Sequence, residues 1–397
     1  MVTLPQIKQR NIAIFYLLSM LGNTWFISGN WIFFWLRFMT YGQLGWIDAL
    51  SFAFGMVMEV PTGAISDLVG KKKTLILAMA LAALGFLIIA PTDNRYQILI
   101  GFLIVQAGWA FYSGAAEAMA YDTLKAQKNE ADFDKVISAS NILGILATVV
   151  CSLIGIGLYM WNFRAPHFAM TITYGLAFFI CWLLVEPSID SEKFSLKNYF
   201  SQLGQGVKQL SIPSLRRFIP LIFILLGIYY MFSYGFIKPA MSEHFGFFAR
   251  GQGFIFAGLS LLSVMLIHFI PQMRKKLTDA QGLVILTALL GSAFVLAGIT
   301  RGLPGALVLL LIVSVGSLAQ PWVSVVVNRE LDSRYRATTL STISMVTKIP
   351  YIFAAVLAGN LIQEGYIVQF NIAVGILTLA VVLVSVVLLR KELKSQV

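Results

Sequence analysis

Long apolar stretches follow one another along this chain, and they limit its fold more than any other feature of the sequence. A helix needs about 20 mostly apolar residues to cross the hydrocarbon core of a bilayer. Such stretches lie at 11–36, 46–66, 74–91, 97–123, 136–160, 168–185, 218–242, 251–273, 282–300, 305–328, 340–362 and 367–389. Only 12% of the residues are charged, about half the share found in soluble domains. We therefore predict an all-α membrane protein with twelve transmembrane helices.

The basic residues predict which side of the membrane each connection faces. Cytoplasmic connections are enriched in Lys and Arg. Alternate connections between the spans face the same side of the membrane. The set that includes both termini holds 22 of the 29 basic residues and the other set holds six, while Lys348 lies inside a span. We expect a multi-pass protein of the cell (inner) membrane with both termini in the cytoplasm. The net charge of +11 reflects this placement, so we expect no nucleic-acid partner.

Two halves of the chain repeat one pattern. Lys71–Lys73 follows the second span, and Arg274–Lys276 follows the eighth span, at the same place in the second half. Repeats of this kind are typical of secondary transporters. We predict two pseudo-symmetric six-helix bundles, at 1–185 and 218–397. The connection 186–217 is predicted to carry an amphipathic helix at the cytoplasmic surface.

Polar residues inside the spans are concentrated on the first, fourth, seventh and tenth helices. Polar groups in the hydrocarbon region are costly, and they usually face a cavity or the interior of the bundle. We predict that four such helices line a substrate cavity and that its lining includes Asn23, Asn30, Arg37, Gln106, Ser113, Tyr230, Tyr234, Lys238, Ser317, Gln320, Ser324 and Lys348. The alternative for any single Asn or Ser is that it only joins neighbouring helices by hydrogen bonds.

The loop after the second span carries a recognisable pattern. Residues 63–72 read Gly-Ala-Ile-Ser-Asp-Leu-Val-Gly-Lys-Lys, which resembles the signature loop of the major facilitator superfamily. Leu68 departs from it, because a basic residue is usual there. The resemblance implies a cytoplasmic gate that includes Gly63, Asp67, Gly70, Lys71, Lys72 and Asp122. In such a gate Asp67 would accept from backbone amides near Thr339–Ser341, and Asp122 would pair with Lys71–Lys73 or Lys125.

Two further segments are similar to a bacterial branch of that superfamily often labelled multidrug efflux. They are Ser113–Asp122 in the fourth span and Arg336–Ser341 before the eleventh. Proton-driven exporters of this kind commonly carry Gly-Pro in the fifth span and an Arg in the fourth, and this sequence has neither.

Ionisable residues within the spans are candidates for proton coupling. We predict this role for Glu117 and Glu59, with a structural acid as the alternative. Lys348 lies at a depth similar to that of Glu117, so it is predicted either to pair with Glu117 or to bind an anionic substrate. His268 is expected to be a packed histidine.

These features together predict a secondary active transporter that works as a monomer by alternating access. We expect proton coupling and export of amphipathic compounds, as in an antiporter. An importer or facilitator of a small metabolite is the alternative, and a receptor or lipid scramblase is an alternative of another class. Without a nucleotide loop, hydrolase motif or metal-ligand spacing, we expect neither an enzyme nor a cofactor.

Overall fold

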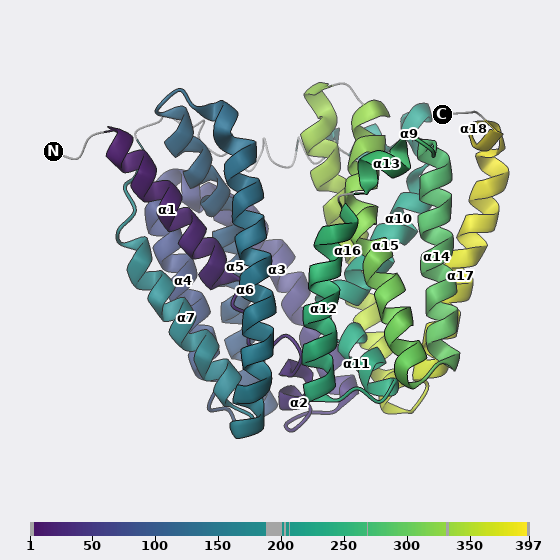
Figure 1. Ribbon diagram of the computed structural model, residues 1–397, viewed down its shortest axis with the longest axis horizontal. Helices are drawn as coiled ribbons and strands as arrows, with labels where there is room; N and C mark the ends of the chain where they lie inside the picture. The colour runs from purple at the N-terminus through teal and green to yellow at the C-terminus, as the bar shows by residue number, and fades with distance from the viewer. Residues whose placement is uncertain are drawn as a thin grey trace. The chain divides into compact units, whose positions relative to one another are not determined.

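The described part of the computed structural model is built from helices, and it comprises residues 4–187, 201, 204–205, 207–267, 269–330 and 333–394. The first half of the chain forms α1 Leu4–Gly22, α2 Trp31–Trp35, α3 Tyr41–Val69, α4 Lys71–Ile89, α5 Arg95–Lys125, α6 Phe133–Trp161 and α7 Ala165–Cys181 (Figure 1). The second half forms α9 Pro213–Arg216, α10 Ile219–Tyr234, α11 Ile237–His244, α12 Ala249–Ile267, α13 Ile270–Arg274, α14 Asp279–Ile299, α15 Gly302–Glu330, α16 Ser333–Gln363, α17 Ile367–Leu388 and α18 Arg390–Lys394.

Length and composition allow seven of the described helices to cross a membrane, or eight if the bent pair α10–α11 is one span. The predicted all-helical membrane fold is confirmed to this extent. Twelve crossings remain a prediction. Most of the predicted amphipathic helix in 186–217 lies outside the described residues.

The contacts divide the chain into two compact units. Unit 1 comprises Met1–Met39, Leu50–Tyr199 and Ala249–Ala257. Unit 2 comprises Thr40–Ala49, Phe200–Phe248 and Gly258–Val397. Each unit therefore includes one short segment from the other half of the chain: the start of α3 belongs to unit 2, and the start of α12 belongs to unit 1.

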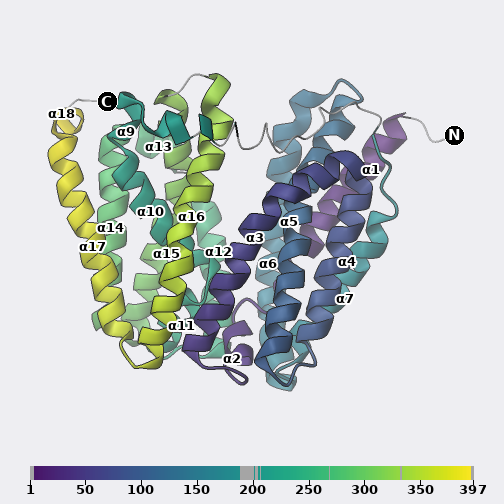
Figure 2. The same ribbon diagram turned by 180° about the vertical axis from the view of Figure 1, so that it is seen from behind.

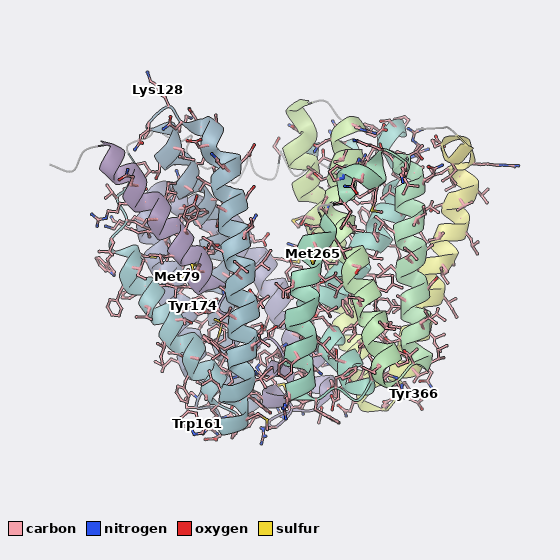
Figure 3. All side chains as sticks on the ribbon, viewed as in Figure 1. Met79, Lys128, Trp161, Tyr174, Met265 and Tyr366 are labelled. Carbon is pink, nitrogen blue, oxygen red and sulfur yellow. The ribbon has the colours of Figure 1, made fainter. Side chains whose placement is uncertain are left out.

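In unit 1, α4 packs against α5 and α7, while α1 packs against α6 and α7. Tyr174 lies inside this unit, between Lys128 and Trp161 at its two ends (Figure 3). Its ring stacks on Phe86 with centroids 5.6 Å apart. Its hydroxyl accepts from Trp109 at 3.0 Å and donates to the Gly22 carbonyl at 3.2 Å. The buried phenol is thus satisfied, as a hydroxyl in an apolar core must be.

In unit 2, α14 packs against α17 and α15, and α10 packs against α16 (Figures 1 and 2). Charged residues join the helix ends where α9 and α18 lie. Arg217, just after α9, pairs with Glu392 of α18 and, at 3.6 Å, with Glu330 at the end of α15. The apolar helix faces hold the middle of the unit, and these ion pairs hold one end.

The first predicted span is not one helix, so Asn23, Asn30 and Arg37, which we predicted to line a cavity from this span, do not lie on one continuous helix. α1 ends at Gly22, and α2 begins at Trp31. The two Asn side chains bond to nearby backbone instead of continuing the helix, since Asn23 donates to the Ser19 carbonyl and Asn30 to the Phe26 carbonyl. Such local bonds are the reason that Asn favours turns over helix interiors.

The seventh predicted span is also broken, between Tyr234 and Ile237, where α10 and α11 meet at 73°. Pro239 explains the break, because it has no N–H for the Gly235 carbonyl and its ring would clash there. As a residue of the first turn of α11, it is well tolerated. Lys238 therefore belongs to a separate helix from Tyr230 and Tyr234, so the prediction of one continuous seventh span is wrong.

Candidate functional site

The predicted ion pair of the gate region is present in unit 1. Lys71, the first residue of α4, pairs with Asp122 near the end of α5. The two side chains are only 11% and 13% exposed. A pair this well buried depends on both partners, because either charge alone would lack compensation.

The start of α4 is fixed by a residue that lies far away in the sequence. The Glu186 carboxylate accepts from the Lys71 amide at 2.8 Å and from the Lys72 amide at 2.7 Å. Gly70 precedes the helix with φ of 97°, a conformation that favours glycine. Helix N-terminal amides favour an anion, so Glu186 joins the end of the α7 segment to α4.

Other parts of the predicted gate lie outside the described side chains. They are the surroundings of Gly63, the side chain of Asp67 and most of Arg336–Ser341, and His268 is also outside. Their predicted roles remain predictions.

The predicted cavity residues of unit 1 bond mainly to backbone. Asn30 is buried and donates to the carbonyls of Phe26 and Gly155. Gln106 donates to the Ser51 carbonyl at 3.3 Å, and Ser113 donates within its own helix to Ala110. These contacts fit the alternative in which such residues join helices. Arg37 is exposed, with its guanidinium 4.3 Å from the centre of the Phe163 ring.

Three polar side chains of unit 2 lie close to the side chain of Tyr230, and we call the four together the Tyr230 cluster: Tyr230, Gln320, Ser344 and Lys348. Gln320 of α15 donates to the Tyr230 hydroxyl. The Ser344 hydroxyl of α16 lies 3.3 Å from it. The Lys348 ammonium lies 5.6 Å from the centre of the Tyr230 ring. Three predicted residues are thus brought together by α10, α15 and α16, and Ser344 is added to them.

The remaining predicted residues of unit 2 have other surroundings. Tyr234 is 60% exposed, and its ring lies 5.4 Å from that of Tyr230. Ser317 donates to its own helix, and Ser324 accepts from Asn328. Trp322 is fully buried against Gly282, and its indole N–H donates to the Asp279 carbonyl.

The structure adds a carboxyl group that the sequence analysis missed. Asp48 of α3 is 6% exposed, and it accepts a hydrogen bond from the Tyr351 hydroxyl of α16. Nearby, Tyr41 donates to Glu243, and the Gly42 amide donates to Gln363 at 2.9 Å. The available signal was the position of Asp48 inside the apolar stretch 46–66.

The predicted proton-coupling residues lie in unit 1. Glu117 on α5 and Glu59 on α3 are both exposed. Lys348 belongs to unit 2, so its predicted pairing with Glu117 remains a prediction.

The sequence profile of the Major Facilitator Superfamily matches residues 12–355. The chain belongs to this superfamily. The predicted family is therefore confirmed, together with a non-enzymatic, multi-pass membrane protein of a transporter family. No curated protein matches the sequence at a significant level.

Solved structures of major facilitator transporters share the fold over nearly the whole chain. The nucleoside transporter NupG matches with a TM-score of 0.76 at 13% identity, covering 97% of this chain and 99% of NupG. A POT family transporter in complex with 5-aminolevulinic acid matches with a TM-score of 0.71 at 12% identity, covering 97% of each chain. The human organic anion transporter MFSD10 matches with a TM-score of 0.63 at 15% identity, covering 95% and 99%. At these identities the likeness concerns the fold.

Proposed function

We propose that this protein moves a small organic solute across the cell membrane by alternating access and that the Tyr230 cluster contacts the solute. The observation that carries the proposal is the gathering of an amide, two hydroxyls and an ammonium in an apolar bundle. Polar groups in a membrane bundle are costly and mark the routes of substrates and ions.

The composition of the cluster suggests the chemistry of the solute. Lys348 supplies a positive charge, while Gln320 and Ser344 can both donate and accept hydrogen bonds. The rings of Tyr229, Tyr230 and Tyr234 follow one another at 5.5 and 5.4 Å. We infer an amphipathic solute with a flat apolar part and an anionic or strongly accepting group.

Direction and driving force are part of the same proposal. The resemblance to the efflux branch favours export in exchange for protons, with Glu117 and Glu59 as proton-binding residues of unit 1. The protein would lie in the inner membrane as a monomer, with both termini in the cytoplasm.

A ligand screen on the purified protein tests the solute class. Thermal unfolding in detergent is measured with nucleosides, short peptides, aromatic carboxylates and amphipathic cations. We expect aromatic carboxylates to raise the unfolding midpoint. Tyr230→Phe should weaken the affinity for these compounds about tenfold, which corresponds to the loss of one hydrogen bond to a charged or polar group. Tyr366→Phe is the matched control, because Tyr366 lies at one end of unit 2 (Figure 3).

Flux measurements test the transport step. Proteoliposomes with the best ligand should accumulate or release it when a pH gradient is imposed. Binding without flux would contradict transport and favour a receptor. Lipid movement between leaflets without solute flux would favour a scramblase.

A further inference from the structure

The feature that the proposed function leaves unexplained is the buried carboxyl group of Asp48. It lies in the second turn of α3, within the segment Thr40–Ala49 that belongs to unit 2. Most of this segment is buried, including Leu44, Ile47 and Ala49. A carboxyl group in such surroundings needs hydrogen-bond donors if it is ionised.

Two donors reach Asp48, and both come from unit 2. One is the Tyr351 hydroxyl, whose ring is 1% exposed. The other is the backbone amide of Phe236, which lies in the break between α10 and α11. A side chain at Gly235 would meet both the Tyr351 hydroxyl and, at 2.9 Å, the Asp48 carboxylate. The break between α10 and α11 therefore makes room for the carboxylate and supplies one of its donors.

The elements that carry this pair and its neighbours also carry other ionisable groups. On α3 itself, Tyr41 is hydrogen-bonded to Glu243 at the end of α11. On α11, Lys238 follows Phe236 by two residues, and on α10 Tyr234 precedes the break. On α16, Lys348 precedes Tyr351 by three residues. The Tyr351 phenol donates a hydrogen bond to Asp48.

We propose that Asp48 binds a proton during the transport cycle and that this proton weakens the attachment of Thr40–Ala49 to unit 2. The proposal rests on the proposed function and adds a proton-binding residue to it. A hydronium ion would give its proton to one carboxylate oxygen, so that one O–H bond of the hydronium breaks, the O–H bond of the carboxylic acid forms, and a water molecule is left. The Tyr351 and Phe236 donors would then face a neutral acid, and hydrogen bonds to a neutral group are about half as strong as those to a charged one.

Helix α16 carries both Tyr351, the partner of Asp48, and Lys348 of the Tyr230 cluster. Residues three apart on a helix lie on neighbouring positions of one face. The Tyr351 hydroxyl donates to Asp48, and the Lys348 ammonium lies 5.6 Å from the centre of the Tyr230 ring. A shift of α16 caused by the proton at Asp48 would therefore reach the residues proposed to contact the solute. This gives proton binding and solute binding one shared element.

Infrared difference spectroscopy tests whether Asp48 takes up a proton. The purified protein in lipid is acidified without any solute, and the carbonyl band of a protonated carboxylic acid is followed. We expect Asp48→Asn to remove a band, Tyr351→Phe to shift it, and Glu243→Gln, the matched control on the neighbouring Tyr–carboxylate pair, to leave it unchanged. An unaltered set of bands in Asp48→Asn would overturn the proposal.

Cysteine labelling tests the release of the segment. In a background with Cys151→Ala and Cys181→Ala, one protein carries Ala49→Cys, which is buried, and another carries Trp46→Cys, which is exposed. The ratio of their maleimide labelling rates cancels the intrinsic effect of pH on the thiol. We expect the ratio to rise about tenfold on acidification, and Asp48→Asn to hold it high at all pH values. A ratio independent of pH in the parent protein would contradict the proposal.

Both measurements are made without solute, so they do not depend on whether the protein transports anything. Loss of the band and of the labelling response in Asp48→Asn, combined with no flux for any solute, would refute the proposed function and leave the proton site. Solute flux combined with an unchanged carbonyl band in Asp48→Asn would refute the proton site and leave the proposed function standing.

Discussion

The carboxylate of Asp279, at the start of α14, lies 3.4 Å from the guanidinium of Arg329 near the end of α15. Lys71 and Asp122 occupy the same places in unit 1, at the start of α4 and near the end of α5, with the charges exchanged. An acid suits the N-terminus of a helix, whereas a cation does not. Unit 1 offsets its cation with the carboxylate of Glu186.

Loss of the Asp122 charge is expected to destabilise unit 1. Asp122→Asn leaves Lys71 nearly buried without its partner, which should cost about 2 kcal/mol of unfolding free energy. The double variant Lys71→Met, Asp122→Asn should recover part of that loss. Thermal unfolding in detergent measures both. Asp93→Asn, which removes the 83% exposed partner of Arg164, is the control and should change little; equal losses in the two Asn variants would contradict the prediction.

The cap at α4 predicts a separate effect of Glu186. Glu186→Gln keeps the shape of the side chain but removes its charge, so it should lower stability by about 1 kcal/mol. Glu130→Gln, at an exposed position outside the long helices, is a suitable comparison. If the two variants unfold at the same temperature as the parent protein, the cap does not stabilise α4.

Close packing of two helices in unit 2 predicts a steric effect. A side chain at Gly45 of α3 would lie 2.5 Å from the Ala355 carbonyl oxygen and 3.2 Å from the Gly359 Cα. Gly45→Ala should therefore cost about 2 kcal/mol. Gly258→Ala in α12, where nothing lies within 4 Å of the added carbon, should be neutral or slightly stabilising. The unfolding midpoints of the two variants are compared with that of the parent protein, and equal midpoints for Gly45→Ala and Gly258→Ala would contradict the prediction.

Topology can be tested in the connection between the two halves. Gln205 is exposed, and Gln205→Cys should react with an impermeant maleimide only when the cytoplasmic side is open to the reagent. Labelling of intact cells from outside would reverse the predicted orientation.

The predicted pairing of Glu117 with Lys348 calls for a double-mutant cycle. Each single change, Glu117→Gln or Lys348→Met, should lower stability and transport, while the double variant should recover stability and lose the response to pH. A coupling energy above about 0.5 kcal/mol would support the pair. Purely additive effects would leave Glu117 as an isolated acid.

Apolar length was enough to predict an all-helical membrane protein, whereas the grouping of the helices and the side that each connection faces stay predictions. The same reasoning failed at Asn23–Asn30 and at Gly235, where it treated one apolar stretch as one helix. The length of an apolar stretch indicates how much of the chain lies in the membrane. The position of a break in the helix depends on single residues within that stretch. Pro239 was visible in the sequence, but its effect on the Gly235 carbonyl requires the register of the helix.

The candidate site was predicted in part. Tyr230, Gln320 and Lys348 were chosen for their polarity inside apolar stretches, and they do meet. Polarity alone did not separate them from Asn30 or Ser317, which bond to backbone. Asp48 was missed, and its significance depends on Tyr351, a residue 303 positions away. Such a pairing is set by tertiary packing, which one sequence does not reveal.

The two exchanged segments have a consequence for how the protein is made. Unit 1 includes Ala249–Ala257, and unit 2 includes Thr40–Ala49. A ribosome that has translated only the first half has therefore not yet delivered all of unit 1, and the start of α3 waits for partners that emerge much later. A gene split in the connection between the halves should give two fragments that accumulate only when they are produced in the same cell.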